Sequence, residues 1–105
     1  FRFATRVAPK VAEKNIQDAG LTKDDIDFFL LHQANFRILD SARKRLKVPK
    51  EKLLHNLEWY GNTSSASVPL LLDESVRNRT IQQGHVLSMI GFGAGLTYGG
   101  MIVRL

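Results

Sequence analysis

Phe28-Phe29-Leu30-Leu31 is a continuous apolar run, and His32-Gln33-Ala34-Asn35 follows it directly. An apolar run of this length, bounded by polar residues, is typical of a buried strand. Ligand-handling groups in α/β sheets gather at the ends of strands, because the connecting loops meet there. The two stretches therefore predict a buried strand over 28–31 with a histidine and two amides at its functional end.

The sequence on either side of this strand has apolar residues at helical spacing. Upstream, the spacing predicts an amphipathic helix that ends before Gly20, a natural left-handed residue after a helix. Pro9 predicts either a kink in this helix or a start near Ala8. Residues 22–25 then indicate a short capped turn. Downstream, a second helix ends before Pro49, and its apolar face holds Ala34, Ile38, Leu39, Ala42 and Leu46.

The rest of the chain continues the alternation of helices and strands. Residues 53–57 form a short apolar segment that we interpret as a strand. Pro69 suits the first turn of a third helix, which we expect to reach Val76, with Asn78 in the left-handed conformation at its end. Two further strands are predicted over 86–90 and 101–105. This alternation indicates an α/β fold with a largely covered, mixed sheet.

Composition and charge restrict the class of protein. The chain has 105 residues, 44% hydrophobic and 24% charged, which fits one small soluble domain. We find no apolar stretch long enough to span a bilayer and no leader that resembles a signal peptide. The chain opens at Phe1 without an initiating methionine, so we expect a fragment or a processed product. With no cysteine, it can form neither disulfides nor thiolate metal sites.

The net charge of +5 comes partly from a basic cluster between Arg37 and Lys52. Such a cluster is either a solvated helix face or a docking patch for an acidic partner. Nucleic acid is a third possible partner, but no motif that combines aromatic and basic residues supports it.

Two further segments accompany the histidine. Gly61 to Ser67 is rich in glycine, serine and threonine and carries Asn62, and Gly91 to Gly95 is rich in glycine. Taken alone, His32 fits a helix cap and Asn62 fits a turn residue. The second segment lacks the lysine of a P-loop and the spacing of a dinucleotide site. It fits a place where the backbone approaches a ligand closely, which only small residues allow.

Taken in order, these motifs resemble the C-terminal part of β-ketoacyl-acyl-carrier-protein synthase III, a thiolase-fold condensing enzyme, over essentially the whole chain. The resemblance rests on the opening Phe-Arg-Phe, Asp25-Ile26-Asp27, His32-Gln33-Ala34-Asn35, Tyr60-Gly61-Asn62-Thr63-Ser64, Leu72-Asp73-Glu74 and Gly91-Phe92-Gly93-Ala94-Gly95-Leu96-Thr97. It implies an α/β, thiolase-like fold in which residues 1–105 form a single C-terminal domain, one half of a five-layered α-β-α-β-α core. The other, N-terminal half, which carries the family's nucleophilic cysteine, would be absent from this chain.

The resemblance also implies a reaction. A starter acyl group moves from coenzyme A to the cysteine, and malonyl-acyl-carrier protein then loses carbon dioxide and attacks the acyl-enzyme to start fatty-acid synthesis. His32 and Asn62 match the two catalytic donors, which stabilise the negative charge on the malonyl thioester oxygen. The backbone N–H of Ala94 matches the second oxyanion hole. Asn35, Ala34 and Phe92 match positions along the pantetheine arm of the substrate.

Further expectations concern partners and location. Arg37 and Lys44, with Arg2 nearby, match a basic rim that receives the acidic carrier protein. The resemblance implies no cofactor and no metal, since coenzyme A thioester is a substrate. It implies a full-length homodimer that binds neither nucleic acid nor membrane, in a bacterial cytoplasm or a plastid stroma. Two alternatives remain: a related acyltransferase of secondary metabolism, or a non-catalytic module that binds carrier protein or coenzyme A. The intact His32 and Asn62 argue against the module, and this fragment alone is expected to be inactive.

Overall fold

The structure is a computed structural model that describes residues 2–32, 36–56, 67–92 and 98–105. Side chains are described for the same residues except 2–4, 67, 92 and 98. The elements follow one another as α1 (Arg2–Asp18), the 3-10 helix η1 (Lys23–Asp25), β1 (Phe28–Leu31), α2 (Phe36–Leu46), the 3-10 helix η2 (Lys50–Lys52), α4 (Ser67–Arg77), β2 (Val86–Phe92) and β3 (Tyr98–Arg104).

The described strands form one mixed sheet in the order β1-β2-β3. β1 runs parallel to β2, with Phe28 opposite Leu87, and β2 runs antiparallel to β3. Asp27 fixes the start of the parallel pair, because its carboxylate accepts the Val86 N–H at 2.8 Å and its own N–H donates to the Val86 carbonyl at 2.9 Å. The mixed sheet that the sequence predicts is therefore confirmed.

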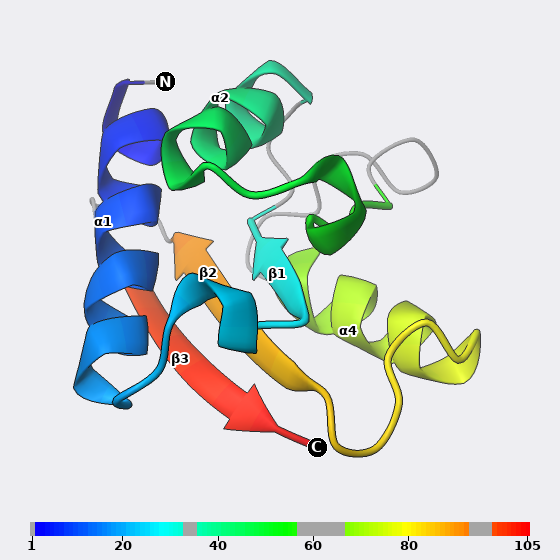
Figure 1. Cartoon of the computed structure of the whole chain (residues 1–105). Coiled ribbons are helices and arrows are strands. Elements are labelled where there is room, and N and C mark those ends of the chain that lie inside the picture. Colours follow the sequence, from blue (N-terminus) through cyan, green and yellow to red (C-terminus); the bar gives the residue numbers. More distant parts are fainter. Residues whose placement is uncertain (1, 33–35, 57–66, 93–97) are drawn as a thin grey trace.

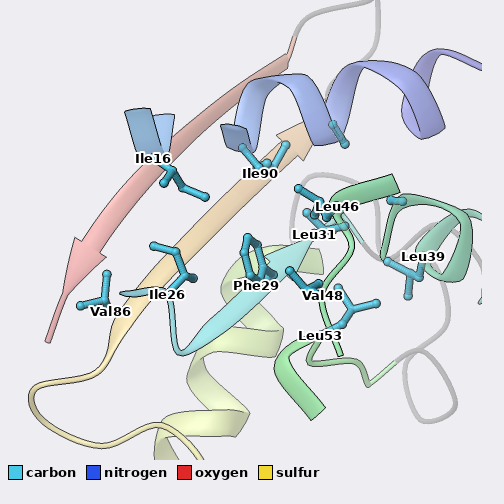
Figure 2. Close-up of a cluster of buried hydrophobic side chains, with 13 residues drawn as sticks. Ile16, Ile26, Phe29, Leu31, Leu39, Leu46, Val48, Leu53, Val86 and Ile90 are labelled. Carbon is cyan, nitrogen blue, oxygen red and sulfur yellow. The ribbon is translucent and has the colours of Figure 1, made fainter. Parts of the chain in front are cut away.

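Helices cover the two faces of the sheet (Figure 1). α1 and α2 pack on one face, where their apolar residues meet Phe29, Leu31 and Ile90 (Figure 2). α4 packs on the other face, where Leu71 meets Leu30 and Leu87. Side chains of a strand alternate between the two faces, so a four-residue strand buried on both sides must be apolar throughout. This explains the unbroken apolar run of β1.

The ends of the helices show which residues adopt the left-handed conformation. Gly20 has a φ of 72°, as predicted, and its N–H donates to the Gln17 carbonyl. Lys47 adopts a φ of 58° in the equivalent place after α2. After α4 our prediction is wrong, because Arg79 rather than Asn78 has the positive φ. The Asn78 N–H still bonds the Glu74 carbonyl as a helical residue would, so the left-handed turn falls one residue later.

Other boundaries also differ from those that the sequence indicates. α1 runs from Arg2 through Pro9, so a start near Ala8 is wrong. Burial of Ala8 and Ala12 on either side of the proline stabilises the helix despite the missing N–H. Residues 53–56 form no strand: only Leu53 makes an isolated bridge, to Phe29, because η2 turns the chain immediately before it.

The hairpin partners β2 and β3 are longer than predicted. β2 continues past Ile90 to Phe92, and β3 begins at Tyr98 and ends at Arg104. The added residues pair with one another, Gly91 opposite Gly99 and Phe92 opposite Tyr98. Glycine has a low strand propensity, so only the pairing itself reveals that these residues belong to strands.

One close contact between α1 and β3 leads to a stability prediction. A Cβ added at Gly100 would meet Asn15 Oδ1 and would lie 2.8 Å from Val11 Cγ1. Overpacking of this kind costs about 1–3 kcal/mol. We expect Gly100→Ala to lower the thermal unfolding midpoint of the full-length protein by a few degrees. Gly99→Ala is the control, since a Cβ there meets nothing within 4 Å in the described part of the chain. An equal loss in both variants would contradict the close approach of α1 as the cause.

Candidate functional site

His32 lies directly after β1, at the carboxyl end of the strand. Its backbone N–H donates to the Ile90 carbonyl at 2.9 Å, which extends the hydrogen bonding between β1 and β2 by one residue. Because β1 and β2 are parallel, both strands end at this edge of the sheet. The histidine is therefore held at the edge where α/β sheets usually bind ligands.

His32 lines a pocket of about 480 Å³ between the sheet and the start of α4. Val68, Pro69 and Leu72 of α4 form one side of this pocket. The other side comes from the paired ends of β2 and β3, namely Met89, Ile90, Gly91, Gly99, Gly100 and Met101. Apart from His32, the lining side chains in the described part of the chain are apolar, and Met101 is 56% exposed in this chain. A polar side chain beside such an apolar surface is suited to orient a reacting group rather than to solvate a charge.

The environment of His32 favours an uncharged ring. Partial burial lowers the pKa of the His32 imidazole below its ordinary value, because a desolvated ring resists taking up a charge. The imidazole is therefore neutral at pH 7 and carries one N–H donor and one acceptor nitrogen.

Most of the other predicted site residues lie outside the described part of the chain. Ala34, Asn35, Asn62 and Ala94 belong to segments that the structure does not describe. Phe92 is the last residue of β2, and its side chain is likewise not described. Described residues close to these segments line one and the same pocket. Val68 follows the segment with Asn62 and lines the same pocket as His32, as does Gly91, which precedes the segment with Ala94.

The predicted basic rim lies on α2. Arg37 and Lys44 are both exposed, as their shared helix face predicts. Lys44 Nζ lies 3.1 Å from Asp40 Oδ2, and Arg43 Nη2 lies 2.9 Å from Asp40 Oδ1. Hydrogen bonds from Arg43 and then Lys44 lower the pKa of the Asp40 carboxyl below its usual range. Arg2, the third predicted member, begins α1, and its side chain is not described.

The ion pairs of Asp40 were not predicted from the sequence, although its spacing of three and four residues from Arg43 and Lys44 is the signal that reveals such pairs. The contact of Asn56 was not predicted either: this residue is 3% exposed, and its Nδ2 donates to Glu74 Oε2 of α4 at 3.2 Å. No local spacing could have revealed that contact, since 18 residues separate the pair. It ties the chain just before residues 57–66 to the helix that follows them.

The described residues contain neither a candidate membrane span nor a candidate metal cluster. No helix among them is both long and apolar enough to cross a membrane. Within the same ranges, no three histidine, aspartate or glutamate side chains come together as a group that could hold a metal ion.

Comparison with known proteins identifies the family to which the chain belongs. Residues 16–105 match the family model described as 3-oxoacyl-[acyl-carrier-protein (ACP)] synthase III C terminal. Because the match covers most of the chain, the protein belongs to this family of thiolase-like condensing enzymes. Its α/β fold with a mixed sheet is accordingly a thiolase-like half-domain, as the motifs predict.

Individual relatives agree with this assignment. The chain is 53% identical over 104 residues to a β-ketoacyl-[acyl-carrier-protein] synthase III of Microcystis aeruginosa, covering 99% of this chain and 31% of that protein. It is also 53% identical to a chloroplastic synthase III B of Cuphea wrightii, covering 99% of this chain and 26% of that protein. Among solved structures, synthase III from Thermus thermophilus superposes with a TM-score of 0.94 at 44% identity, covering 99% of this chain and 32% of that one. The chain thus spans about a third or less of these relatives.

Proposed function

We propose that this chain is the C-terminal catalytic part of a synthase III that condenses an acyl-coenzyme A starter with malonyl-acyl-carrier protein, the first step of fatty-acid synthesis. The observation that carries the proposal is the placement of a neutral His32 on the apolar pocket at the end of β1. The nucleophilic cysteine and the remaining pocket walls would come from the N-terminal half of the same enzyme. The whole enzyme would be a homodimer located in a bacterial cytoplasm or a plastid stroma.

The proposed reaction has two steps. In the first, a cysteine thiolate of the N-terminal half attacks the acyl-coenzyme A carbonyl, and coenzyme A leaves as a thiolate that takes up a proton from water. In the second, malonyl-carrier protein loses carbon dioxide and becomes an enolate. The enolate carbon attacks the acyl-cysteine carbonyl, the carbon–sulfur bond breaks, and the cysteine thiolate is regenerated. No cofactor enters this balance, because both acyl donors are thioester substrates.

His32 and Asn62 would stabilise the second step. As carbon dioxide leaves, the electrons of the breaking bond move onto the malonyl thioester oxygen. The His32 N–H and the Asn62 amide would each donate a hydrogen bond to this oxygen. Fixed donors in an apolar pocket reorganise little when the charge develops, which is why they lower the barrier. The Ala94 N–H would donate to the acyl-cysteine oxygen, while Ala34, Asn35 and Phe92 would line the path of the pantetheine arm.

Reconstitution tests the proposed function. The full-length protein, incubated with acyl-coenzyme A and malonyl-carrier protein, is expected to release carbon dioxide and coenzyme A and to form the 3-oxoacyl-carrier protein. The 105-residue chain is the control and should form none, because it contains no cysteine to carry the acyl group. Condensation by the short chain alone, or none by the full-length protein with any acyl-coenzyme A, would overturn the proposal.

A further inference from the structure

A hydrogen bond between Asn56 and Glu74 joins the two ends of the segment that carries Asn62. Asn56 Nδ2 donates to Glu74 Oε2 at 3.2 Å, although 18 residues separate the two in the sequence. Asn56 is the last described residue before 57–66, and Glu74 lies on α4, the helix that begins directly after that segment at Ser67. The bond therefore connects the chain before the segment with the helix after it.

The chain that leads to Asn56 is held on β1. Leu53 makes a parallel bridge to Phe29, and the Leu54 N–H donates to the Phe29 carbonyl at 3.1 Å. The Leu54 side chain packs against the apolar cluster on the α4 side of the sheet. Phe29 belongs to the strand that ends directly before His32. The position of Asn56 is thus fixed relative to the strand that holds His32.

Glu74 belongs to a helix whose start forms one wall of the pocket at His32. Val68 and Leu72 of this helix line the pocket. Leu71 is buried against the sheet, and residues three apart lie on the same side of a helix, so Glu74 follows it on the side that packs inward. A bond to Glu74 therefore fixes the helix that supplies this wall.

The chemistry of the bond is suited to setting a position. Asn56 is 3% exposed, and a buried amide destabilises a fold unless it is hydrogen bonded. Apolar packing would stabilise the same place without that requirement, but it has no preferred direction. A hydrogen bond requires a particular distance and angle, and one to a carboxylate is stronger than one between neutral groups. The Asn56 and Glu74 pair can therefore hold two segments in one arrangement.

We propose that Asn56 and Glu74 are positioning residues whose bond sets where the Asn62 amide stands relative to His32. The inference rests on the proposed function, which assigns His32 and Asn62 the two hydrogen bonds to the malonyl thioester oxygen. Two donors stabilise one oxygen only if both reach it at once, so the placement of the segments that carry them decides the rate. Asn56 and Glu74 act through Asn62 rather than on the substrate.

The test reverses the bond in the full-length enzyme. Asn56→Asp places a carboxylate opposite Glu74 and is expected to lower kcat for decarboxylation of malonyl-carrier protein about 10- to 100-fold, because small misplacements of a catalytic group are costly. Asn56→Asp combined with Glu74→Gln exchanges donor and acceptor and should return kcat to within about threefold of the unaltered enzyme. Asn78→Asp is the matched control, because Asn78 is exposed after the end of α4, and it should change nothing.

Removal of Asn62 distinguishes positioning from a merely structural role. In an enzyme that already carries Asn62→Ala, Asn56→Asp should lower decarboxylation less than about twofold further, because residues that act through one another have non-additive effects. Loading from acyl-coenzyme A and KM for malonyl-carrier protein should change little. The same loss with and without Asn62, or equal losses in loading and decarboxylation, would overturn the inference.

A second variant and the unaltered enzyme complete the test. If Asn56→Asp does not fold, Glu74→Ala takes its place, because Glu74 is only partly buried and its removal brings no second charge to the contact. The same pattern of effects is expected. Insensitivity of decarboxylation to both variants would overturn the positioning role and leave the proposed function intact. An unaltered enzyme that fails to condense would refute the proposed function itself.

Discussion

Replacing His32 by alanine in the full-length protein is expected to slow the decarboxylation of malonyl-carrier protein by about 100- to 1,000-fold, the usual cost of one oxyanion donor. The neutral imidazole lies beside a pocket whose other described side chains are apolar, so none of them can donate the lost hydrogen bond. Asn62→Ala should cause a loss of the same order. The measurement is the rate of carbon dioxide release from malonyl-carrier protein at saturating substrate.

The loading reaction and a second histidine serve as controls for this prediction. Loading of the cysteine from acyl-coenzyme A should be affected much less in both variants, because no malonyl enolate forms in that step. His85→Ala should leave decarboxylation unchanged, since His85 precedes β2 at the opposite edge of the sheet and accepts the Gln82 N–H. Equal losses in loading and decarboxylation would contradict the role assigned to His32 and Asn62.

The second large effect is expected from reversing charge on α2. The double substitution Arg37→Glu, Lys44→Glu should raise KM for malonyl-carrier protein about 5- to 10-fold at low salt, because repulsion replaces attraction during encounter. Asp40 pairs with Lys44 in the structure, so Lys44→Glu would also place two carboxylates beside each other on α2. The value of kcat at saturation and the loading step should change much less.

Salt and a matched variant test whether this effect is electrostatic. The increase in KM should shrink as salt rises, since the screening length falls from about 10 Å at 0.1 M to about 3 Å at 1 M. Lys10→Glu, Lys14→Glu changes the net charge equally on α1, where both lysines are exposed, and should leave KM near that of the unaltered enzyme. If the α2 variant lost both half-reactions equally at every salt concentration, the patch would be structural.

Local sequence patterns correctly predicted β1 and the buried face of α2. The apolar run 28–31 predicts β1 with the bounds that the structure shows, because helices pack on both faces of the sheet and bury Phe29, Leu30 and Leu31. The face of α2 with Leu39, Ala42 and Leu46 is buried as predicted. The position of His32 at the carboxyl end of β1 follows from the same run.

Local sequence patterns did not predict the secondary structure of segments whose pairing partner is distant in the sequence. Residues 53–56 have the composition of a strand, yet η2 leaves only Leu53 in register with Phe29. Gly99 and Gly100 have low strand propensity, yet pairing with β2 places both in β3. The left-handed residue predicted after α4 was wrong for a local reason: helical hydrogen bonding extends through Asn78, so Arg79 has the positive φ.

The sequence by itself determined the alternation of helices and strands, the family, and the polar residues available for chemistry. These depend on spacing and residue type along the chain, which are local properties. Only the tertiary structure decided which residues stand together: His32 with the start of α4 and the end of β2, and Asn56 with Glu74. Each of these contacts joins segments many residues apart, and their distance in space depends on how the helices pack against the sheet rather than on any pattern within either segment.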